Sequence, residues 1–409
     1  MLLPVLLKSI FRTGTLTLID ANGRTHRFGN NEEPRVTIRL HNKALHTHLF
    51  FNPMLAVGEA FMNETLTVEE GGDVYDFLAL SLCNLGTTYG HWGQELIASL
   101  RQMTRRIAQY NPVGTAQRNV AHHYDLSDTL YELFLDKDRQ YSCAYFATSE
   151  DSLDEAQENK KRHIAAKLLL TPESRVLDIG SGWGGLALYL SRVSGADVTG
   201  VTLSTEQQTV SQDRAASTGL ADRVRFKLID YRDVDGRFDR IVSVGMFEHV
   251  GVGHYREFFN KIRNLLADDG VALLHSIGRF DGPGSTNPWV RKYIFPGGYV
   301  PALSEVLPAI ERSGLVTADI EILRLHYAET LKAWRLNFNK HRDKIRKIYD
   351  DRFCRMWEFY LAGSEASFRH GGIMVFQIQI AKQQDAVPLT RDYITDWERA
   401  QQKRDRAAA

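Results

Sequence analysis

The segment VLDIGSGWGG, at residues 176–185, constrains the fold of this chain more than any other part of the sequence. Residues 176–179 have the apolar character of a strand, and residues 186–192 have that of a helix. Glycines stand between them at 180, 182, 184 and 185, where the absence of a Cβ lets a ligand approach the backbone. The helix also offers unpaired N–H groups at its start. This order predicts a nucleotide-type pocket at the carboxyl end of a parallel strand.

One residue separates this segment from the dinucleotide-binding pattern. Asp178 lies inside the end of the strand, where its carboxylate can orient the loop or hold a cation such as an amino-acid ammonium. We therefore interpret the segment as a cradle for S-adenosylmethionine, which carries an amino-acid group and a positive sulfonium. The alternative is a glycine-rich turn without a ligand.

The rest of the chain beyond residue 176 alternates between apolar runs of strand length and helical segments. Further strands are expected at 198–202, 224–229, 241–244 and 271–275, with helices at 205–217 and 255–266. Two last strands are expected at 320–326 and 374–380, with a long helix between them. This alternation predicts an α/β fold with a doubly wound parallel sheet.

Other segments complete the expected domain organisation. Residues 1–110 read as a smaller α+β domain, with strands at 14–20 and 36–40 and helices at 73–85 and 92–109. A linker follows at 111–122, the catalytic domain at 123–390 and a polar tail at 391–409. Residues 278–301 interrupt the alternation with Gly and Pro, and their aromatic side chains are expected to cap the pocket. These aromatic residues are Phe280, Trp289, Tyr293, Phe295 and Tyr299.

Composition narrows the range of partners. The 409 residues include 50 basic and 50 acidic side chains, whereas a general nucleic-acid binder usually has a basic excess. Three cysteines, far apart and without a CxxC pair, indicate neither a disulfide framework nor a zinc site and fit a reducing cytosol. No apolar run reaches about 18 residues, and Pro4 and Lys8 interrupt the apolar start. We therefore expect no membrane span and no signal peptide.

Polar residues follow the second and third expected strands, at the edge where a ligand would bind. Thr202 and Ser204 end the second strand in place of the acid that grips ribose hydroxyls in many nucleotide folds, which argues against a nicotinamide enzyme. After the third strand, Asp230 could bond an adenine amino group and Tyr231 could stack on the ring. The alternative for this pair is a turn carboxylate and a rim aromatic.

Glu248 and His275 follow the fourth and fifth expected strands in an apolar context. An unpaired charge is costly there. Burial raises the pKa of a carboxyl and a neighbouring group tunes a histidine toward neutrality, so together they could form an acid–base centre. The alternative is a hydrogen-bonded structural pair. His249 could instead cap the helix that follows it.

Seven segments together resemble the cyclopropane fatty acid synthases, a family within the class I methyltransferases with a Rossmann-like sheet. They are HHYDLSDTLYELFLD (122–136), QYSCAYF (140–146), VLDIGSGWGG, GVTLSTEQ (200–207), GMFEHVG (245–251), HSIGR (275–279) and LHYAETLKAW (325–334). The resemblance covers about residues 115–382. It is weaker over the first domain, where GEAFMNE (58–64) resembles the full-length bacterial members.

The resemblance implies a reaction and two bound groups. Members transfer a methylene from S-adenosylmethionine to a cis double bond of a phospholipid acyl chain, with a bicarbonate ion as the base. By motif position the cofactor residues would be Tyr141, Ser142, Gly180, Gly182, Thr202, Leu203, Gln207 and Tyr231, to which the residue analysis adds Asp230. The bicarbonate residues would be Cys143, Glu248, His275, Ile277 and Tyr327.

This reaction explains why such residues are needed. An alkene is a weak nucleophile, so the methyl group must be held in line with it at roughly 3 Å. Ring closure then requires a base, and water must be excluded so that the cation on the acyl chain is not quenched. Aromatic faces stabilise a nearby cation without attacking it. Cys143 could instead be a small core residue, and Tyr327 a core aromatic.

The implied substrate lies in a bilayer, so a membrane contact is expected. Residues 331–356 contain nine Lys or Arg and three Asp, with apolar residues at spacings near 3.6, and read as a basic amphipathic helix. The alternative is an outer helix packed on the sheet. The resemblance further implies a cytoplasmic protein, peripheral at the inner membrane surface, and a homodimer by analogy with other members.

Three other functions remain open. A related enzyme could leave a methyl- or methylene-branched acyl chain without closing a ring. A small-molecule methyltransferase could use the aromatic cap as its pocket. The third is a non-catalytic lipid-binding protein. The residues Cys143, Glu248, His275 and Tyr327 argue against it, because binding a lipid requires no base.

Overall fold

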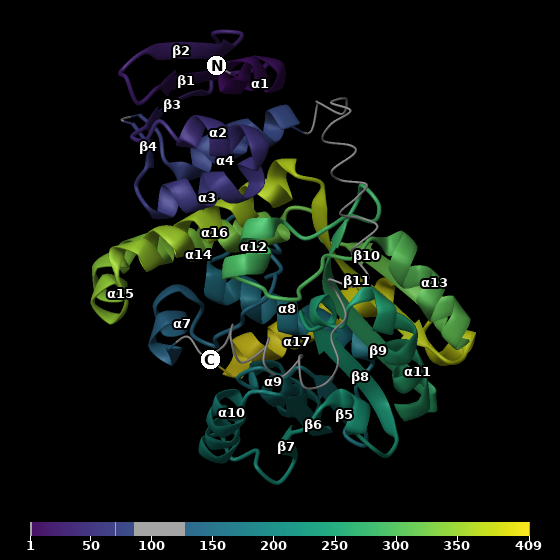
Figure 1. Ribbon diagram of the computed structural model, residues 1–409. Helices are drawn as coiled ribbons and strands as arrows, with labels where there is room; N and C mark the ends of the chain where they lie inside the picture. The colour runs from purple at the N-terminus through teal and green to yellow at the C-terminus, as the bar shows by residue number, and fades with distance from the viewer. Residues whose placement is uncertain (1, 70, 86–126, 409) are drawn as a thin grey trace.

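The computed structural model describes residues 2–69, 71–85 and 127–408. Within them the chain forms a four-stranded sheet near the N-terminus and a seven-stranded sheet in the larger part (Figure 1). The helix expected at 92–109 and the linker expected at 111–122 lie outside the described residues. No helix of the described part is long and apolar enough to cross a membrane.

The smaller sheet has the strand order β2-β1-β3-β4. β1 and β3 are the two strands that alternation in the sequence predicts, and alternate residues such as Leu16 and Leu18 are buried. β2 buries only Phe28, and β4 has only 3 residues, so neither carries a clear signal in the sequence. The elements of this part are α1 (Leu2–Ile10), β1 (Thr15–Ile19), β2 (Thr25–Gly29), β3 (Arg35–Leu40), α2 (Leu45–Phe51), α3 (Pro53–Met62), β4 (Leu66–Val68) and α4 (Val74–Leu85).

The larger sheet has the strand order β10-β11-β9-β8-β5-β6-β7. The five strands from β9 to β7 pair in parallel, and β11 and β10 add antiparallel pairings at one edge. This confirms the predicted α/β fold with a doubly wound sheet. The strand order reverses at β5, so a crevice opens at the carboxyl ends of β5 and its neighbours. The strands are β5 (Arg175–Ile179), β6 (Asp197–Thr202), β7 (Val224–Leu228), β8 (Phe238–Val244), β9 (Leu266–Arg279), β10 (Val316–Ile322) and β11 (Ile373–Ala381).

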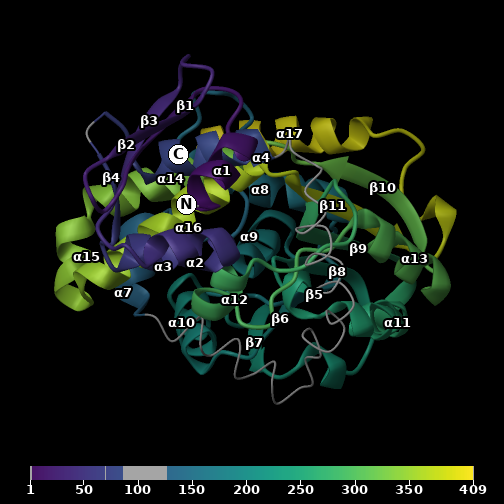
Figure 2. The same ribbon diagram turned by 45° about the horizontal axis from the view of Figure 1, so that its top comes forward.

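Helices cover both faces of the larger sheet (Figures 1 and 2). α8 and α9 pack on the face that carries Val176 and Val242, while α11 and α13 pack on the opposite face with Leu177 and Ile241. The helices of this part are α7 (Asp128–Phe134), α8 (Leu153–Leu168), α9 (Gly185–Ser194), α10 (Thr205–Ser217), α11 (Tyr255–Leu265), α12 (Pro288–Tyr293), α13 (Leu303–Ser313), α14 (His326–Lys340), α15 (Arg342–Ile348), α16 (Asp351–His370) and α17 (Asp392–Ala408).

Two expectations for the C-terminal third are wrong. The strand expected at 320–326 ends at Ile322, and α14 already begins at His326. The single basic helix expected at 331–356 is divided among α14, α15 and α16. Asp350 starts α16, because its side chain accepts a hydrogen bond from the N–H of Phe353 at 2.6 Å.

The two ends of the chain pack on the larger part. α3 and α4 lie on α16, which places the smaller sheet at one end of the molecule (purple in Figure 1). The residues expected as a polar tail form α17, which packs along α8 and buries Ile394.

Candidate functional site

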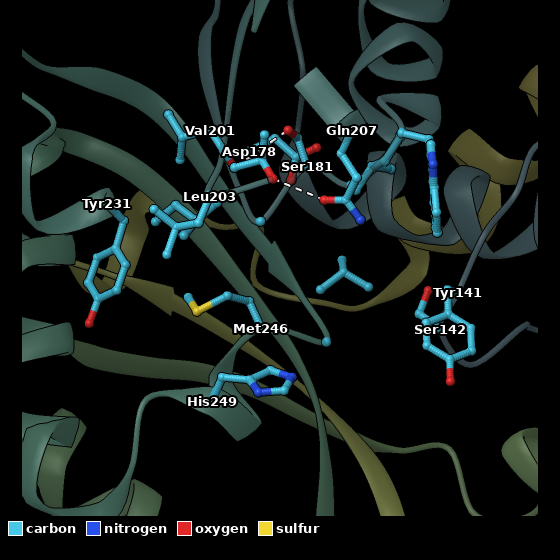
Figure 3. Close-up of a pocket in the computed structure, with 18 of the residues that line it drawn as sticks. Tyr141, Ser142, Asp178, Ser181, Val201, Leu203, Gln207, Tyr231, Met246 and His249 are labelled. Carbon is cyan, nitrogen blue, oxygen red and sulfur yellow. Dashed lines mark hydrogen bonds between the residues drawn. The ribbon is translucent and has the colours of Figure 1, made fainter. Parts of the chain in front are cut away.

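A pocket of about 1220 Å³, partly open to solvent, lies at the carboxyl ends of β5, β6, β7 and β8. Tyr231 and Tyr141 stand on opposite sides of it, Asp178 and Gln207 on another side, and His249 faces them across the space (Figure 3). All nine residues predicted to hold the cofactor line this one pocket. They are Tyr141, Ser142, Gly180, Gly182, Thr202, Leu203, Gln207, Asp230 and Tyr231.

The glycines of the turn after β5 have different structural roles. Gly182 has φ 54°, and a Cβ there would meet no atom within 4 Å, so its backbone faces the open pocket. A Cβ on Gly180, at φ 82°, would lie 2.9 Å from the Cβ of Met246. The sequence suggested that Gly184 and Gly185 also serve a ligand, but a Cβ on either would meet protein side chains at 2.6 Å and 2.4 Å. These two glycines therefore serve close packing.

Asp178 lines the pocket with a carboxyl oxygen that lacks a hydrogen-bond partner among the described residues. This oxygen is Oδ2, and the residue is buried. Burial raises the pKa of this carboxyl to about 7, although the Lys160 ammonium acts in the opposite direction. A positively charged group in the pocket would restore the carboxylate, so the site fits the ammonium of an amino-acid moiety.

The ends of β6 and β7 supply further polar groups. Thr202 Oγ1 donates to Gln207 Oε1 at 2.9 Å, which holds the amide at the pocket edge. Asp230, expected to bond an adenine, lines the pocket and accepts two hydrogen bonds from the Arg232 guanidinium at 2.9 Å and 2.8 Å. The Tyr231 ring lines the pocket and packs edge-on against Phe258. Burial raises the pKa of Tyr231, so its hydroxyl stays protonated.

Lys160, on α8, is a site residue that sequence reasoning missed. Its ammonium is fully buried and donates to Gln140 Oε1 at 2.6 Å and to Ser142 Oγ at 2.8 Å. Burial lowers the pKa of Lys160 to about 8, although nearby Asp136 acts against this. α8 is polar all round and gives no apolar periodicity, so nothing in the sequence marked this lysine as buried.

His249 is the second missed residue. Its ring lines the pocket and packs edge-on against Phe295 at 6.0 Å between centroids. Burial lowers the pKa of His249 to about 4, so the ring is neutral. The available signal in the sequence was a histidine directly after the predicted acid at 248, a position that also suits a helix cap.

Glu248, the residue before the pocket-lining His249, is a buried carboxyl. Glu248 Oε1 accepts a hydrogen bond from the Ile277 N–H at 2.7 Å, while Oε2 has no partner among the described residues. Burial raises the pKa of Glu248 to about 7. Glu248 and His275 are not hydrogen-bonded to each other in the described part, so the reading as a structural pair is wrong. His275 instead contacts Gln377, with 3.1 Å between Nδ1 and Nε2.

The remaining residues of the predicted bicarbonate set lie nearby but outside the pocket lining. Cys143 and Tyr327 share one apolar cluster with Ile277. The Cys143 thiol contacts the Ala144 carbonyl at 3.2 Å, and burial raises its pKa, so it stays a thiol. Lys160 acts electrostatically on both Cys143 and His275, so its charge reaches both. The structure thus joins Glu248 to Ile277 directly and brings the other three to the same region.

The expected aromatic cap is only partly present. Phe295 alone among the five packs its ring on a described residue that lines the pocket, His249. Phe280 is exposed. Trp289 and Tyr293 face α3, and Tyr299 packs in the core of the larger sheet. Most of these rings therefore serve packing between elements.

A family model described as mycolic acid cyclopropane synthetase matches residues 113–378, well over half of the chain. The chain belongs to this family. The resemblance to cyclopropane fatty acid synthases that the motifs indicated is thereby confirmed. A second model, described as a domain of unknown function, matches residues 4–84.

Relatives of this family member agree with the assignment. A probable fatty acid methyltransferase from Pseudomonas putida is 36% identical over 388 residues, 93% of this chain and 94% of the relative. The cyclopropane-fatty-acyl-phospholipid synthase of Escherichia coli strain K12 is 41% identical over 260 residues, 64% of this chain and 66% of the relative. The solved mycolic acid cyclopropane synthase CmaA1, complexed with SAH and CTAB, has a TM-score of 0.62 at 32% identity and covers 66% of this chain and 99% of its own.

Proposed function

We propose that this protein transfers a methylene group from S-adenosylmethionine to the cis double bond of an unsaturated phospholipid acyl chain and closes a cyclopropane ring. One observation carries the proposal: a single pocket is lined by all nine predicted cofactor residues and by His249, and the residue before His249 is Glu248, a buried carboxyl whose Oε2 has no partner among the described residues. The Escherichia coli relative bears the name of this activity, and the solved relative CmaA1 is complexed with SAH.

Different residues of the pocket would bind different parts of the cofactor. S-adenosylmethionine supplies, when bound, an electrophilic methyl group on a positive sulfur. Asp178 would hold the ammonium of its amino-acid part, and Gly182 leaves the backbone open to it. Tyr231 would stack at one side, while Tyr141 closes the opposite side. The stacked rings of Tyr141 and Trp334, 5.2 Å apart, exclude water there.

The region around Glu248 suits a small anion, and we propose bicarbonate as the base. Bicarbonate would supply a proton acceptor beside this buried carboxyl. The Lys160 charge acts on Cys143 and His275 and would favour an anion beside them, and a protonated Glu248 could donate to that anion through Oε2. The Ile277 N–H is already donated to Glu248, so it positions the carboxyl rather than the ion.

A second product is a methyl- or methylene-branched acyl chain. Two relatives favour it by name: the Pseudomonas putida protein, and a tuberculostearic acid methyltransferase from Mycobacterium tuberculosis that is 36% identical over 337 residues. The methylene-branched chain needs only the same cofactor pocket and lipid substrate, because the cation loses a proton to form the exocyclic double bond. The methyl-branched chain also needs a hydride donor that reduces the cation or the methylene product.

The test uses the full chain, vesicles of monounsaturated phosphatidylglycerol and phosphatidylethanolamine, and cofactor labelled in its methyl group. We expect label in the lipid fraction, a mass gain of one CH₂ per acyl chain, and cyclopropane ring protons in the NMR spectrum of the product. Vinylidene protons would establish the branched product instead. Absence of label from the lipid would overturn both assignments and leave a small-molecule substrate.

We further propose that the enzyme meets the surface of an anionic membrane peripherally, through α15 and the end of α14. α15 projects from the molecule in Figure 1, and Lys340, Lys344, Lys347 and Ile348 are exposed there. Arg342 is held by Glu358 at 2.6 Å and is left out of the proposal.

Charge reversal of the three lysines to Glu should weaken binding to anionic vesicles about tenfold, with no effect on binding to neutral ones. The matched control reverses Lys403, Arg404 and Arg406, which are equally exposed on α17. Equal losses in both variants would remove α15 from the contact.

A further inference from the structure

A row of polar side chains, half-buried at its two glutamates and buried elsewhere, runs from the C-terminal helix to His275. It crosses from α17 through α8 to the antiparallel edge of the sheet and ends on β9. No residue of the row other than His275 belongs to the predicted site. In order, the row is Glu398, His163, Glu321, Lys167, Gln377 and His275.

The first half of the row is ionic. His163 Nδ1 lies 2.7 Å from Glu398 Oε1, and its Nε2 lies 2.7 Å from Glu321 Oε2. Two carboxylates accept from one ring only if both ring nitrogens carry protons, and these contacts raise the pKa of His163 against the effect of burial. The same Glu321 oxygen contacts the Lys167 ammonium, and the two cations lower the pKa of Glu321. Positive and negative groups therefore alternate and are all partnered.

Lys167 fixes the orientation of the next amide. Its Nζ lies 2.8 Å from Gln377 Oε1, and an ammonium can only donate, so this atom must be the amide oxygen. The amide nitrogen of Gln377 then faces His275 Nδ1 at 3.1 Å. An amide nitrogen can only donate, so Nδ1 of His275 must be the acceptor.

His275 itself carries a single ring proton. Burial lowers its pKa to about 3, and the charges of Lys160, Lys167 and His163 act in the same direction. With Nδ1 occupied as an acceptor, the proton of the neutral ring resides on Nε2. Among the described residues none hydrogen-bonds to this Nε2, so its N–H is available to a bound group.

We propose that Gln377, held by Lys167, is a positioning residue that fixes His275 as the tautomer protonated on Nε2. His275 is then a hydrogen-bond donor to an anion in the site and does not accept the proton removed during ring closure. The inference rests on the proposed function for what the donor holds. The tautomer itself follows from the hydrogen bonds alone.

The tautomer can be measured without any reaction. The full chain is labelled with ¹⁵N at histidine only, and two-bond ¹H–¹⁵N correlations distinguish protonated from unprotonated ring nitrogens. The signals of His275 are assigned by their absence from a His275→Gln spectrum. We expect an unprotonated Nδ1 and a protonated Nε2 from pH 6 to 8. A proton on Nδ1, or a doubly protonated ring, would overturn the inference.

Two variants test the role of Gln377. Gln377→Glu places an acceptor beside Nδ1, so the ring proton should move to Nδ1, and kcat should fall about 100-fold with the KM for cofactor unchanged. Gln377→Met removes the donor and should leave a mixture of tautomers.

Gln379→Glu is the matched control. Gln379 lies two residues along β11, is equally buried, and bonds to the Lys167 carbonyl and the Tyr393 hydroxyl instead of to His275. It should keep the Nε2 tautomer. If Gln377→Glu kept that tautomer as well, Gln377 would not be the residue that fixes it. If the wild type showed the expected tautomer but modified no lipid, the proposed function would fail and the tautomer would stand.

Discussion

The surroundings of Glu248 determine the pKa of its carboxyl and which of its oxygens can bind another group, whereas its position in the sequence only suggests a role at the site. The strand-end position predicted a carboxyl at the site, and burial then raises its pKa to about 7. The contact with the Ile277 N–H determines which oxygen remains available.

This pKa predicts a pH-dependent stability. Folded Glu248 keeps a proton that the unfolded chain releases above its ordinary pKa of 4.5, so the folded state loses stability as pH rises from 4.5 to about 7. Glu248→Gln removes this loss, and the variant should gain up to about 3 kcal/mol relative to wild type across that window. Urea unfolding of the ligand-free proteins at several pH values measures the difference. A difference that is constant with pH would contradict the assignment.

The glycines after β5 predict two separable defects. Gly182→Ala puts a methyl group into open pocket space at positive φ, so it should weaken cofactor binding while costing only about 1 kcal/mol of stability. Gly184→Ala drives a methyl against Phe226 and Ser211, so it should cost more stability than Gly182→Ala does. Calorimetric titration with the cofactor and thermal unfolding distinguish the two. The reverse pattern would show that Gly182 does not face the ligand.

The site could be predicted from sequence wherever a residue followed a strand or a glycine-rich turn. Thr202, Asp230 and Tyr231 were placed in this way, because parallel strands end at a common edge. Lys160 and His249 could not be placed, since the burial of a polar helix and the direction of a short turn depend on what packs over them.

Among the elements, the parallel strands were predictable and the C-terminal helices were not. The apolar runs of β5, β6 and β8 are buried on both faces, which gives a strong signal. The helices α14 and α16 pack against each other, and each turns apolar residues toward the other. The sequence therefore keeps an apolar spacing near 3.6 although the chain reverses direction between the two helices. Asp350 before Phe353 was the local signal that a new helix begins.

The GEAFMNE segment (58–64) ties α3 to the larger part. Glu59 Oε1 accepts from Lys292 Nζ at 2.6 Å and from the Tyr293 hydroxyl at 2.8 Å. The Trp289 indole lies over Gly58, where an added Cβ would be 2.5 Å from the ring. The segment therefore holds α12, the helix within the predicted cap, against the first part of the chain.

Gly58→Ala should loosen this contact. The added methyl must displace Trp289, which should cost about 1–3 kcal/mol of stability and leave cofactor affinity unchanged, since Trp289 does not line the pocket. Gly72→Ala is the control, because a Cβ there meets its nearest atom at an ordinary 3.4 Å. Thermal unfolding and cofactor titration measure both quantities. Equal stability of the two variants would mean that Trp289 yields without cost.

At the scale of the whole molecule, α17 packs on α8, and the Glu398 side chain of α17 contacts the ring of His163. The raised pKa of His163 means that its contribution to stability is fully present below its ordinary pKa of 6.5 and is lost as pH rises through the folded value. Glu398→Gln should therefore be less stable than wild type by about 1–2 kcal/mol near pH 6, and the gap should shrink at alkaline pH.

Urea unfolding across this range checks the sign. Asp396→Asn is the control, because Asp396 is exposed on the same helix. A gap that widened at alkaline pH would show that His163 is neutral in the folded protein.

The close fit of Trp289 over Gly58 has a consequence for exchanging parts between relatives. The first unit and the remainder match separate family models, yet here a tryptophan on one side requires the smallest residue on the other. A hybrid that takes its first unit from a relative with a bulkier residue at this point would force the indole outward. Functional hybrids should arise only when the first unit also carries a glycine where it meets the indole.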